Sequence, residues 1–303
     1  MCVSLGPATF SNTILYVGSA LRNGKLVHVL GYQNTAQNLA TKVEPPPSSL
    51  DPKLWSQVVK EKGASQVPAG NAMILPFPAS AVMTKENVID TSGCPGILKD
   101  IAESVKPKSR GSFSKGLDFD DVCFSAGVEV FDTGIYTVVL ARDPRAIPAA
   151  LEQVPIEKRP DLKPEIFAAY AEWYPGWQIA LCCFSNAEAV EADPLLWWYE
   201  PAFPDVYFAP ALDSHTGGVP DLDAKVELDH TLAVGSPEGK GAPIEYAGRL
   251  PEEVRAFLPT HGLGQEFSGY AGNGDFLIDR KDAQSGKFAP DRVKPGANPA
   301  INL

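Results

Sequence analysis

The sequence feature that most constrains the fold is a strict alternation of apolar and polar residues within the stretch 207–235. One set of alternate positions, mostly apolar, is Val226, Leu228, His230, Leu232 and Val234. The polar positions between them are Lys225, Glu227, Asp229 and Thr231. Side chains with a period of two point to opposite faces of an extended strand. The pattern predicts a strand with one buried face that includes His230. Asp229 points to the opposite face, so it is not expected to orient His230 as a catalytic partner.

Other segments predict a chain built mainly from strands. Short apolar runs bounded by Gly, Pro, Asn or Asp predict strands at 2–5, 13–19, 25–31, 71–78, 122–124, 128–131, 135–140, 178–184 and 205–212. Apolar stripes and capping residues predict helices at 51–62, 97–105, 144–154, 164–173 and 250–258. Residues 207–235 are expected to form two neighbouring strands, and 267–279 a hairpin. This order of elements predicts an α+β fold with mainly antiparallel β-sheets and a few short helices.

The length of the chain predicts one compact domain, 1–303, because a chain of 303 residues can bury a large core. The segment 106–116, KPKSRGSFSKG, is basic and poor in apolar residues. Such a composition is typical of exposed linkers, so a division near 106–116 into 1–105 and 117–303 is the alternative. For the same reason we expect this segment to be the most protease-sensitive part of the chain.

The charge of the chain is concentrated in one region. The formal net charge is −11, and residues 184–238 hold eleven acidic residues against Lys225 alone. Such a field disfavours nucleic acid and anionic membranes, and it favours a divalent cation, a cationic small molecule or a basic protein surface. A solvated acidic face kept for solubility is the alternative. The absence of a signal peptide and of a long apolar run indicates a cytoplasmic protein, and five scattered cysteines indicate reduced thiols.

Ten aromatic residues are gathered between positions 173 and 208. They are consistent with an aromatic wall for a ligand or partner, or with a core seam around the predicted strand 178–184. Core packing is the interpretation favoured by their density. His28 and His230 are likewise expected to be structural, hydrogen-bonded histidines.

Cys2 is a candidate catalytic nucleophile. Removal of Met1 would leave a thiol next to a free α-amine that can act as a base near neutral pH. The opening MCVSLG is similar to the starts of choloylglycine-type amide hydrolases, and this resemblance implies cleavage of an amide bond by Cys2. At 31–34, after the second predicted strand, the chain has Gly-Tyr-Gln-Asn where that family carries an Arg-x-Met-Asp-like segment.

A second candidate site lies in the Gly- and Asp-rich loop that follows the predicted strand 205–212. Its acidic and imidazole side chains are those of Asp213, His215, Asp221 and Asp223. Carboxylates and an imidazole are ligands of divalent cations, and Asp213 with His215 could also activate a water molecule. The spacing matches no metal-binding motif, and loop acids commonly serve as solvated or capping residues.

Two classes of function therefore remain open. The first is a hydrolase of amide or ester bonds that uses Cys2, or water activated near Asp213 and His215. The second is a binding or assembly protein, in an oligomer of identical chains or alone, that uses its acidic, aromatic-rich middle as an interaction surface.

Overall fold

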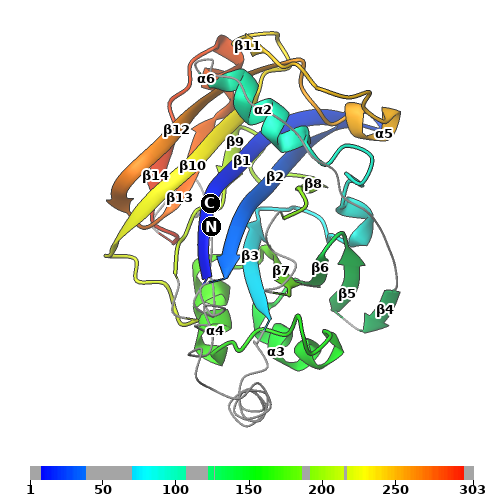
Figure 1. Cartoon of the computed structure of the whole chain (residues 1–303), viewed down its shortest axis with the longest axis vertical. Helices are drawn as coiled ribbons and strands as arrows, with labels where there is room; N and C mark the ends of the chain where they lie inside the picture. The colour runs from blue at the N-terminus through cyan, green and yellow to red at the C-terminus, as the bar shows by residue number, and fades with distance from the viewer. Residues whose placement is uncertain are drawn as a thin grey trace, which may run out of the picture.

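The structure is a computed structural model of the whole chain, and its strands form three sheets (Figure 1). The residues it describes are 8–38, 70–106, 122–125, 127–185, 192–214 and 217–296. Cys2, His215 and the predicted helix 51–62 lie outside these residues, as does nearly all of the segment 106–116.

The largest sheet has six strands in the order β11-β12-β10-β1-β2-β8. These strands are β1 (Ala8–Arg22), β2 (Lys25–Asn38), β8 (Leu195–Tyr199), β10 (Lys225–Gly235), β11 (Ala242–Pro243) and β12 (His261–Gly272). All neighbours pair antiparallel except β1 and β10, which run parallel. The prediction of a mostly antiparallel β structure with a few short helices is confirmed, and this parallel pair is an exception to it.

The sequence predicts turns at Phe10 to Asn12 and at Arg22 to Gly24, and only the second is a turn of the hairpin of β1 and β2. Asn23 and Gly24 both have positive φ, 51° and 77°, as the tight turn predicted there requires. The residues Phe10 to Asn12 also look like a turn in the sequence, but they lie inside β1. The register shifts between Ser11 and Ile14, and Asn12 has a φ of 54°, so this segment is a β-bulge.

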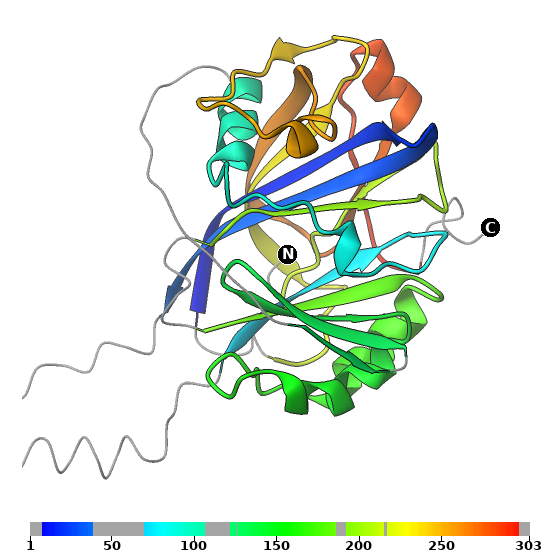
Figure 2. The ribbon, with the colours of Figure 1, turned by 90° about the vertical axis from the view of Figure 1, so that its right-hand side faces the viewer.

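The second sheet has five antiparallel strands in the order β3-β7-β6-β5-β4. These are β3 (Asn71–Phe77), β4 (Val122–Ser125), β5 (Val128–Thr133), β6 (Tyr136–Ala141) and β7 (Gln178–Phe184). β3 lies at the edge of this sheet, as Pro76 and Pro78 in the predicted strand 71–78 indicate, because proline cannot donate a hydrogen bond to a neighbouring strand. Two helices, α3 (Ile147–Ala150) and α4 (Pro164–Trp173), cover its outer face (Figure 2).

The third sheet corrects two predictions. Its strands β9 (Val206–Ala209), β13 (Asp275–Asp279) and β14 (Asp291–Val293) are ordered β14-β13-β9. β9 and β10 therefore belong to different sheets, and residues 207–235 do not form two neighbouring strands. β12 and β13 are also in different sheets, because β12 pairs with β10 and β13 pairs with β9. Residues 267–279 therefore connect two sheets and do not form the predicted hairpin.

The remaining elements are short. They are α2 (Ile97–Val105), α5 (Glu252–Arg255), α6 (Arg280–Ser285) and three 3-10 turns, η2 (Lys85–Asn87), η3 (Pro144–Ala146) and η4 (Leu151–Gln153). The predicted helices 97–105 and 164–173 have the predicted bounds. The predicted helix 250–258 is reduced to the single turn α5, and 144–154 is divided among η3, α3 and η4.

Three apolar cores hold these layers together. The central core lies between the two large sheets and includes Leu15, Leu30, Leu75 and Trp197. A second core packs α3 and α4 against the outer face of the five-stranded sheet, and a third packs α2 against the outer face of the six-stranded sheet. The chain is thus layered as helix, sheet, sheet and helices (Figure 2).

The predicted alternation of apolar and polar residues at 225–234 is confirmed within the six-stranded sheet. Leu228, His230, Leu232 and Val234 are buried, and Val226 is partly buried against the same central core. Most of the aromatic residues between 173 and 208 are also buried, so they form a core seam and not an aromatic surface. Both cysteines of the strand β7, Cys182 and Cys183, are buried free thiols.

The pairing of strands crosses the segment 106–116 in both large sheets. β1 pairs with β10, β2 with β8, and β3 with β7. The organisation into one domain stays a prediction, and strands from both sides of the segment contribute to each of these sheets. None of the described helices has both the length and the apolar character that crossing a bilayer requires.

Candidate functional site

The loop that follows β9 is held by a residue distant in sequence, Asn273. The Asn273 side chain is 2% exposed, and its Oδ1 accepts a hydrogen bond from the backbone N–H of Asp213 at 2.9 Å. Its Nδ2 donates to the backbone oxygens of Asp213 and Asp221, at 2.8 and 3.0 Å. One buried amide therefore fixes both ends of the loop.

The acidic side chains of this loop have local partners. Asp221 Oδ1 accepts a hydrogen bond from the backbone N–H of Asp223 at 2.9 Å, which closes a turn. The Asp223 carboxylate pairs with Lys294 at 2.5 Å, and this hydrogen bond lowers the pKa of Asp223. Within the described parts of the chain, no group of three or more His, Cys, Asp or Glu side chains could hold a metal ion. The metal site with His215 stays a prediction.

Asp275 supports the same loop by binding the backbone just before it. This carboxylate is 1% exposed and accepts hydrogen bonds from the backbone N–H groups of Ala211 and Leu212 and from the Tyr174 hydroxyl, at 2.8, 3.2 and 2.5 Å. Burial raises the pKa of Asp275, and these hydrogen bonds offset part of the rise. Arg292, whose Nη2 donates to the Ala211 oxygen at 3.3 Å, adds a nearby positive charge. The cluster holds the backbone that carries Asp213.

Two other acids of the region 184–238 are paired with basic residues from distant parts of the chain. Besides the pair of Asp223 and Lys294, Glu200 pairs with Lys25 at 3.1 Å and Asp205 with Arg280 at 3.6 Å. The acidic stretch is therefore less negative in the folded protein than in the sequence. Its concentration of charge does not by itself locate a binding site.

Each of the two buried histidines has a polar contact through one ring nitrogen, while the other, Nδ1 of His28 and Nε2 of His230, has no hydrogen-bond partner among the described residues. His28 Nε2 lies 3.3 Å from the Pro204 backbone oxygen, and burial lowers the pKa of His28 to about 4. His230 and Asp229 leave opposite faces of β10, yet His230 Nδ1 lies 3.8 Å from Asp229 Oδ1. That nitrogen accepts a hydrogen bond from the backbone N–H of Asp229 at 3.3 Å, so it does not bind the carboxylate.

A polar cavity of about 280 Å³ lies on the outer face of the six-stranded sheet, beside α2. It is lined by Asn12, Ile14, Gln33, Asn34, Thr35, Lys99, Ala102, Glu103, Lys106, Ala192, Asp229, Thr231 and Glu266. The contributing segments are the bulge of β1, the strands β2, β10 and β12, one side of α2, and Ala192 in the connection before β8. We call this space the polar cavity.

The register of the sheet explains why the cavity is there. Gly31, Tyr16, Ala233 and Gly264 lie opposite one another on four adjacent strands, and α2 packs on this row. Two residues further along each strand, the next row on the same face is Gln33, Ile14, Thr231 and Glu266. This second row is mostly polar and borders the polar cavity. The sheet face therefore changes from apolar beneath α2 to polar beside it.

The opposite wall comes from α2. Lys99, Ala102, Glu103 and Lys106 recur at spacings of three and four residues, so they lie along one side of the helix. Lys106 pairs with Glu266 of β12 at 3.5 Å, which links the helix end to the sheet. Charged groups from both elements therefore face the same space.

Asp229 and Gln33 are the most informative residues of the cavity. Asp229 Oδ2 accepts a hydrogen bond from the Asn12 backbone N–H at 2.6 Å, because the bulge of β1 turns this N–H toward β10. Burial raises the pKa of Asp229, and hydrogen bonds from the backbone N–H groups of Asn12 and Thr13 oppose the rise. The Gln33 side chain is 4% exposed and donates to the Ala192 oxygen at 2.8 Å. Its Oε1 has no hydrogen-bond partner among the residues that the structure describes.

This site was not predicted from the sequence because its residues come from six separate segments. Asp229 and Thr231 were assigned to the polar face of their strand, which is where they lie. Gln33 belongs to an amide-rich stretch that the structure assigns to the end of β2. A polar row beside an apolar row on one sheet face was the available signal, and it requires the strand register to be recognised.

No protein-family model matches the sequence, and no curated protein matches it. Among solved structures, the chain is similar to the crystal structure of baculovirus P35, with a TM-score of 0.39 and 11% sequence identity. The match covers 91% of this chain and 90% of that chain. A likeness of this degree carries no inference about function.

Proposed function

We propose that the protein binds a small polar molecule with an amino group in the polar cavity. The observation that supports this proposal is the pair of acceptors on its sheet wall, the Asp229 carboxylate and the Gln33 amide oxygen. Gln33 Oε1 is buried without a described donor, which costs about 1–3 kcal/mol, and a ligand N–H would remove that cost if the Gln33 amide turned this oxygen toward the cavity.

The charges of the cavity favour the same class of ligand. Its lining includes the carboxylates of Glu103, Asp229 and Glu266, against the ammonium groups of Lys99 and Lys106. One lysine is already paired with Glu266. An ammonium group placed at Asp229 would form a charge-assisted hydrogen bond, which is stronger than a neutral one.

The proposal belongs to the binding class of function, with the polar cavity in place of an aromatic surface. Among the described residues that line the cavity, none is a Cys, Ser or His. The lining thus offers hydrogen bonds and charge, and it lacks the usual pairing of a nucleophile with an imidazole base.

Binding can be measured with putrescine, agmatine and arginine as amine probes and succinate as the anionic probe, at constant ionic strength. We expect at least one amine to bind the unmodified protein, and Asp229→Asn to weaken that binding about tenfold or more, since a hydrogen bond to a charged group contributes about 1.5–3 kcal/mol. An asparagine oxygen can still accept from the Asn12 N–H, so the variant should remain folded.

Glu227→Gln is the matched control, because Glu227 is exposed on the same face of β10 and does not line the cavity. This variant should bind the amine as the unmodified protein does. Failure of all three amines to bind, or equal binding by Asp229→Asn, would contradict the proposal.

The hydrolase hypothesis remains a separate proposal in two versions, one that depends on Cys2 and one that depends on water activated near Asp213 and His215; the first can be tested directly. The Met-Cys opening supports it, and the intact mass of protein produced without an N-terminal tag tests it. Removal of Met1 is required for the α-amine to act as a base, so a retained Met1 would exclude this version of the mechanism.

A further inference from the structure

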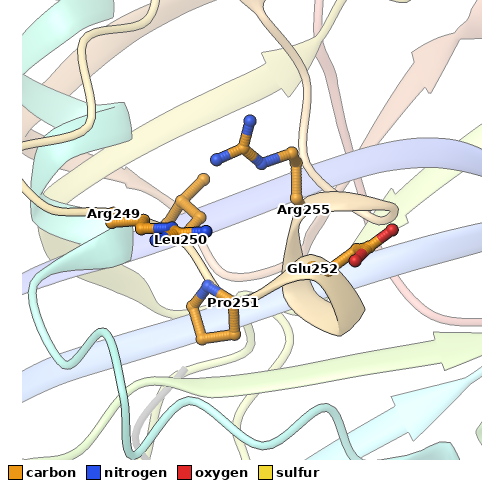
Figure 3. A pocket seen from close by; sticks show the side chains of 5 residues that line it. All are labelled: Arg249, Leu250, Pro251, Glu252 and Arg255. Atoms are coloured by element: carbon orange, nitrogen blue, oxygen red, sulfur yellow. The ribbon is translucent and has the colours of Figure 1, made fainter.

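A second hollow, of about 460 Å³, lies at the turn that contains α5 and is separate from the polar cavity. It is lined by Arg249, Leu250, Pro251, Glu252 and Arg255 (Figure 3). Both arginines are exposed, and the guanidinium groups border the same space from two sides. Two cationic groups therefore meet in one hollow of a chain whose net charge is −11.

No carboxylate neutralises these arginines within the described parts of the chain. Neither Arg249 nor Arg255 forms an ion pair there, in contrast to Lys25, Arg280 and Lys294, which pair with acids. Figure 3 shows the Glu252 carboxylate directed away from both guanidinium groups. Two like charges that share a hollow repel one another, and an anion between them would remove that repulsion.

The segment that carries the arginines is fixed to the body of the protein. Leu250 and Val254, which are adjacent in sequence to Arg249 and Arg255, are buried in the core beneath α2. The backbone N–H of Ala247 donates to Asp100 Oδ2 of α2 at 3.0 Å, and the Tyr246 hydroxyl donates to the Pro259 oxygen at 2.8 Å. The bases of both arginine side chains are thus held in place, which lowers the entropy that binding would cost.

We propose that this hollow binds an oxyanion, the carboxylate or phosphate group of a small molecule, held between Arg249 and Arg255. Guanidinium groups present two parallel N–H donors that match the oxygen atoms of carboxylates and phosphates. Leu250 and Pro251 provide an apolar base beside these donors, which suits a ligand with a short carbon skeleton next to its anionic group.

The test is a titration with sodium phosphate and, separately, sodium succinate, each against sodium chloride at equal ionic strength, followed by calorimetry and thermal melts. We expect one of the two anions to bind beyond the chloride response, and the anion that binds distinguishes phosphate from carboxylate recognition. Arg249→Ala with Arg255→Ala should weaken that binding about tenfold or more, as the loss of charge-assisted hydrogen bonds implies.

Two further variants make the result specific. Arg249→Lys with Arg255→Lys keeps the charges and removes the paired donors, so it should bind with intermediate affinity. Arg145→Ala removes an exposed arginine that pairs with Asp143 elsewhere, and it should bind as the unmodified protein does. The inference is overturned if neither anion exceeds the chloride response, or if the double alanine variant binds as well as the unmodified protein.

Discussion

The loop 213–223 and the polar cavity both present acidic side chains, yet the two regions use them differently. In the loop, Asp221 closes a turn and Asp223 pairs with Lys294, while Asn273 and Asp275 hold the backbone. In the cavity, Asp229 keeps one side toward an open space and Gln33 has an oxygen without a described partner. The difference teaches that the proposal of a ligand rests on acceptors that border an open space, and not on the number of acids.

The sharpest test of the structural role of the loop is Asp275→Ala. This substitution leaves two buried backbone N–H groups and the Tyr174 hydroxyl without their acceptor, and we expect the free energy of unfolding to fall by about 4 kcal/mol. Chemical denaturation measures the loss. Asp275→Asn keeps one acceptor oxygen and should lose less, and amine binding at the polar cavity should persist in it. An unchanged stability in the alanine variant would mean that the cluster does not support the loop.

The pH dependence of folding tests a buried polar group that belongs to neither region, His28. Its ring packs against Tyr199 and Tyr207, and burial lowers its pKa from 6.5 to about 4, with nearby Arg280 lowering it and Asp205 raising it. Between these two values the unfolded chain binds a proton that the folded chain does not. Stability should therefore fall as the pH falls from 6.5 to 4, by up to about 3 kcal/mol.

The His28→Gln variant removes this titration, so its stability should depend less on pH in that interval. His261→Gln is the control, because His261 is only partly buried, beside Thr260. Urea denaturation at several pH values measures both variants. Equal slopes for His28→Gln and the unmodified protein would show that His28 does not remain neutral in the folded state.

Asn273→Ala should have an intermediate effect that is confined to the loop. The side chain makes three hydrogen bonds to the backbone of Asp213 and Asp221, and their loss should cost about 2 kcal/mol. Amide hydrogen exchange at Asp213 should become faster than in the unmodified protein. Faster amide exchange at Asp229 and Thr231 as well would show that the loop and the polar cavity are coupled, and we do not expect this result.

The smallest effect expected is that of calcium. If the loop acids are occupied by their local partners, melting temperatures in calcium chloride and in sodium chloride should agree at equal ionic strength. A cation-specific gain of about 1 kcal/mol or less, lost in Asp213→Asn with Asp221→Asn, would instead support a metal site that includes His215. That result would remove the distinction drawn between the two regions.

Local patterns predicted the elements of the fold better than their arrangement. Periodicity and proline positions are properties of neighbouring residues, so α2, α4 and β7 were predicted with the bounds that they have. The assignment of β9 and β10 to different sheets depends on pairing with β13 and β1, at distances along the chain that no local pattern encodes.

The candidate site was harder to predict for the same reason. Asn12 has the polar character of a turn residue, and only the paired strand shows that its positive φ forms a bulge that directs an N–H to Asp229. Gln33 becomes informative only when its buried oxygen is seen to lack a described partner. Residues that bind through an assembled sheet face carry no spacing signature in the sequence.

The distance between α2 and the sheet is determined by two positions that have no side chain. A Cβ atom on Gly31 would lie 2.7 Å from Leu98 Cδ2, and a Cβ atom on Gly264 would collide with Val105. The nearest contact of each Cβ atom is with the helix, the one on Gly264 would also lie 2.8 Å from the Leu232 backbone oxygen of β10, and neither glycine lines the polar cavity. Single substitutions at Gly264, from alanine to serine to valine, would therefore raise one end of the helix in steps. The series would change the width of the polar cavity while the residues that line it stay the same.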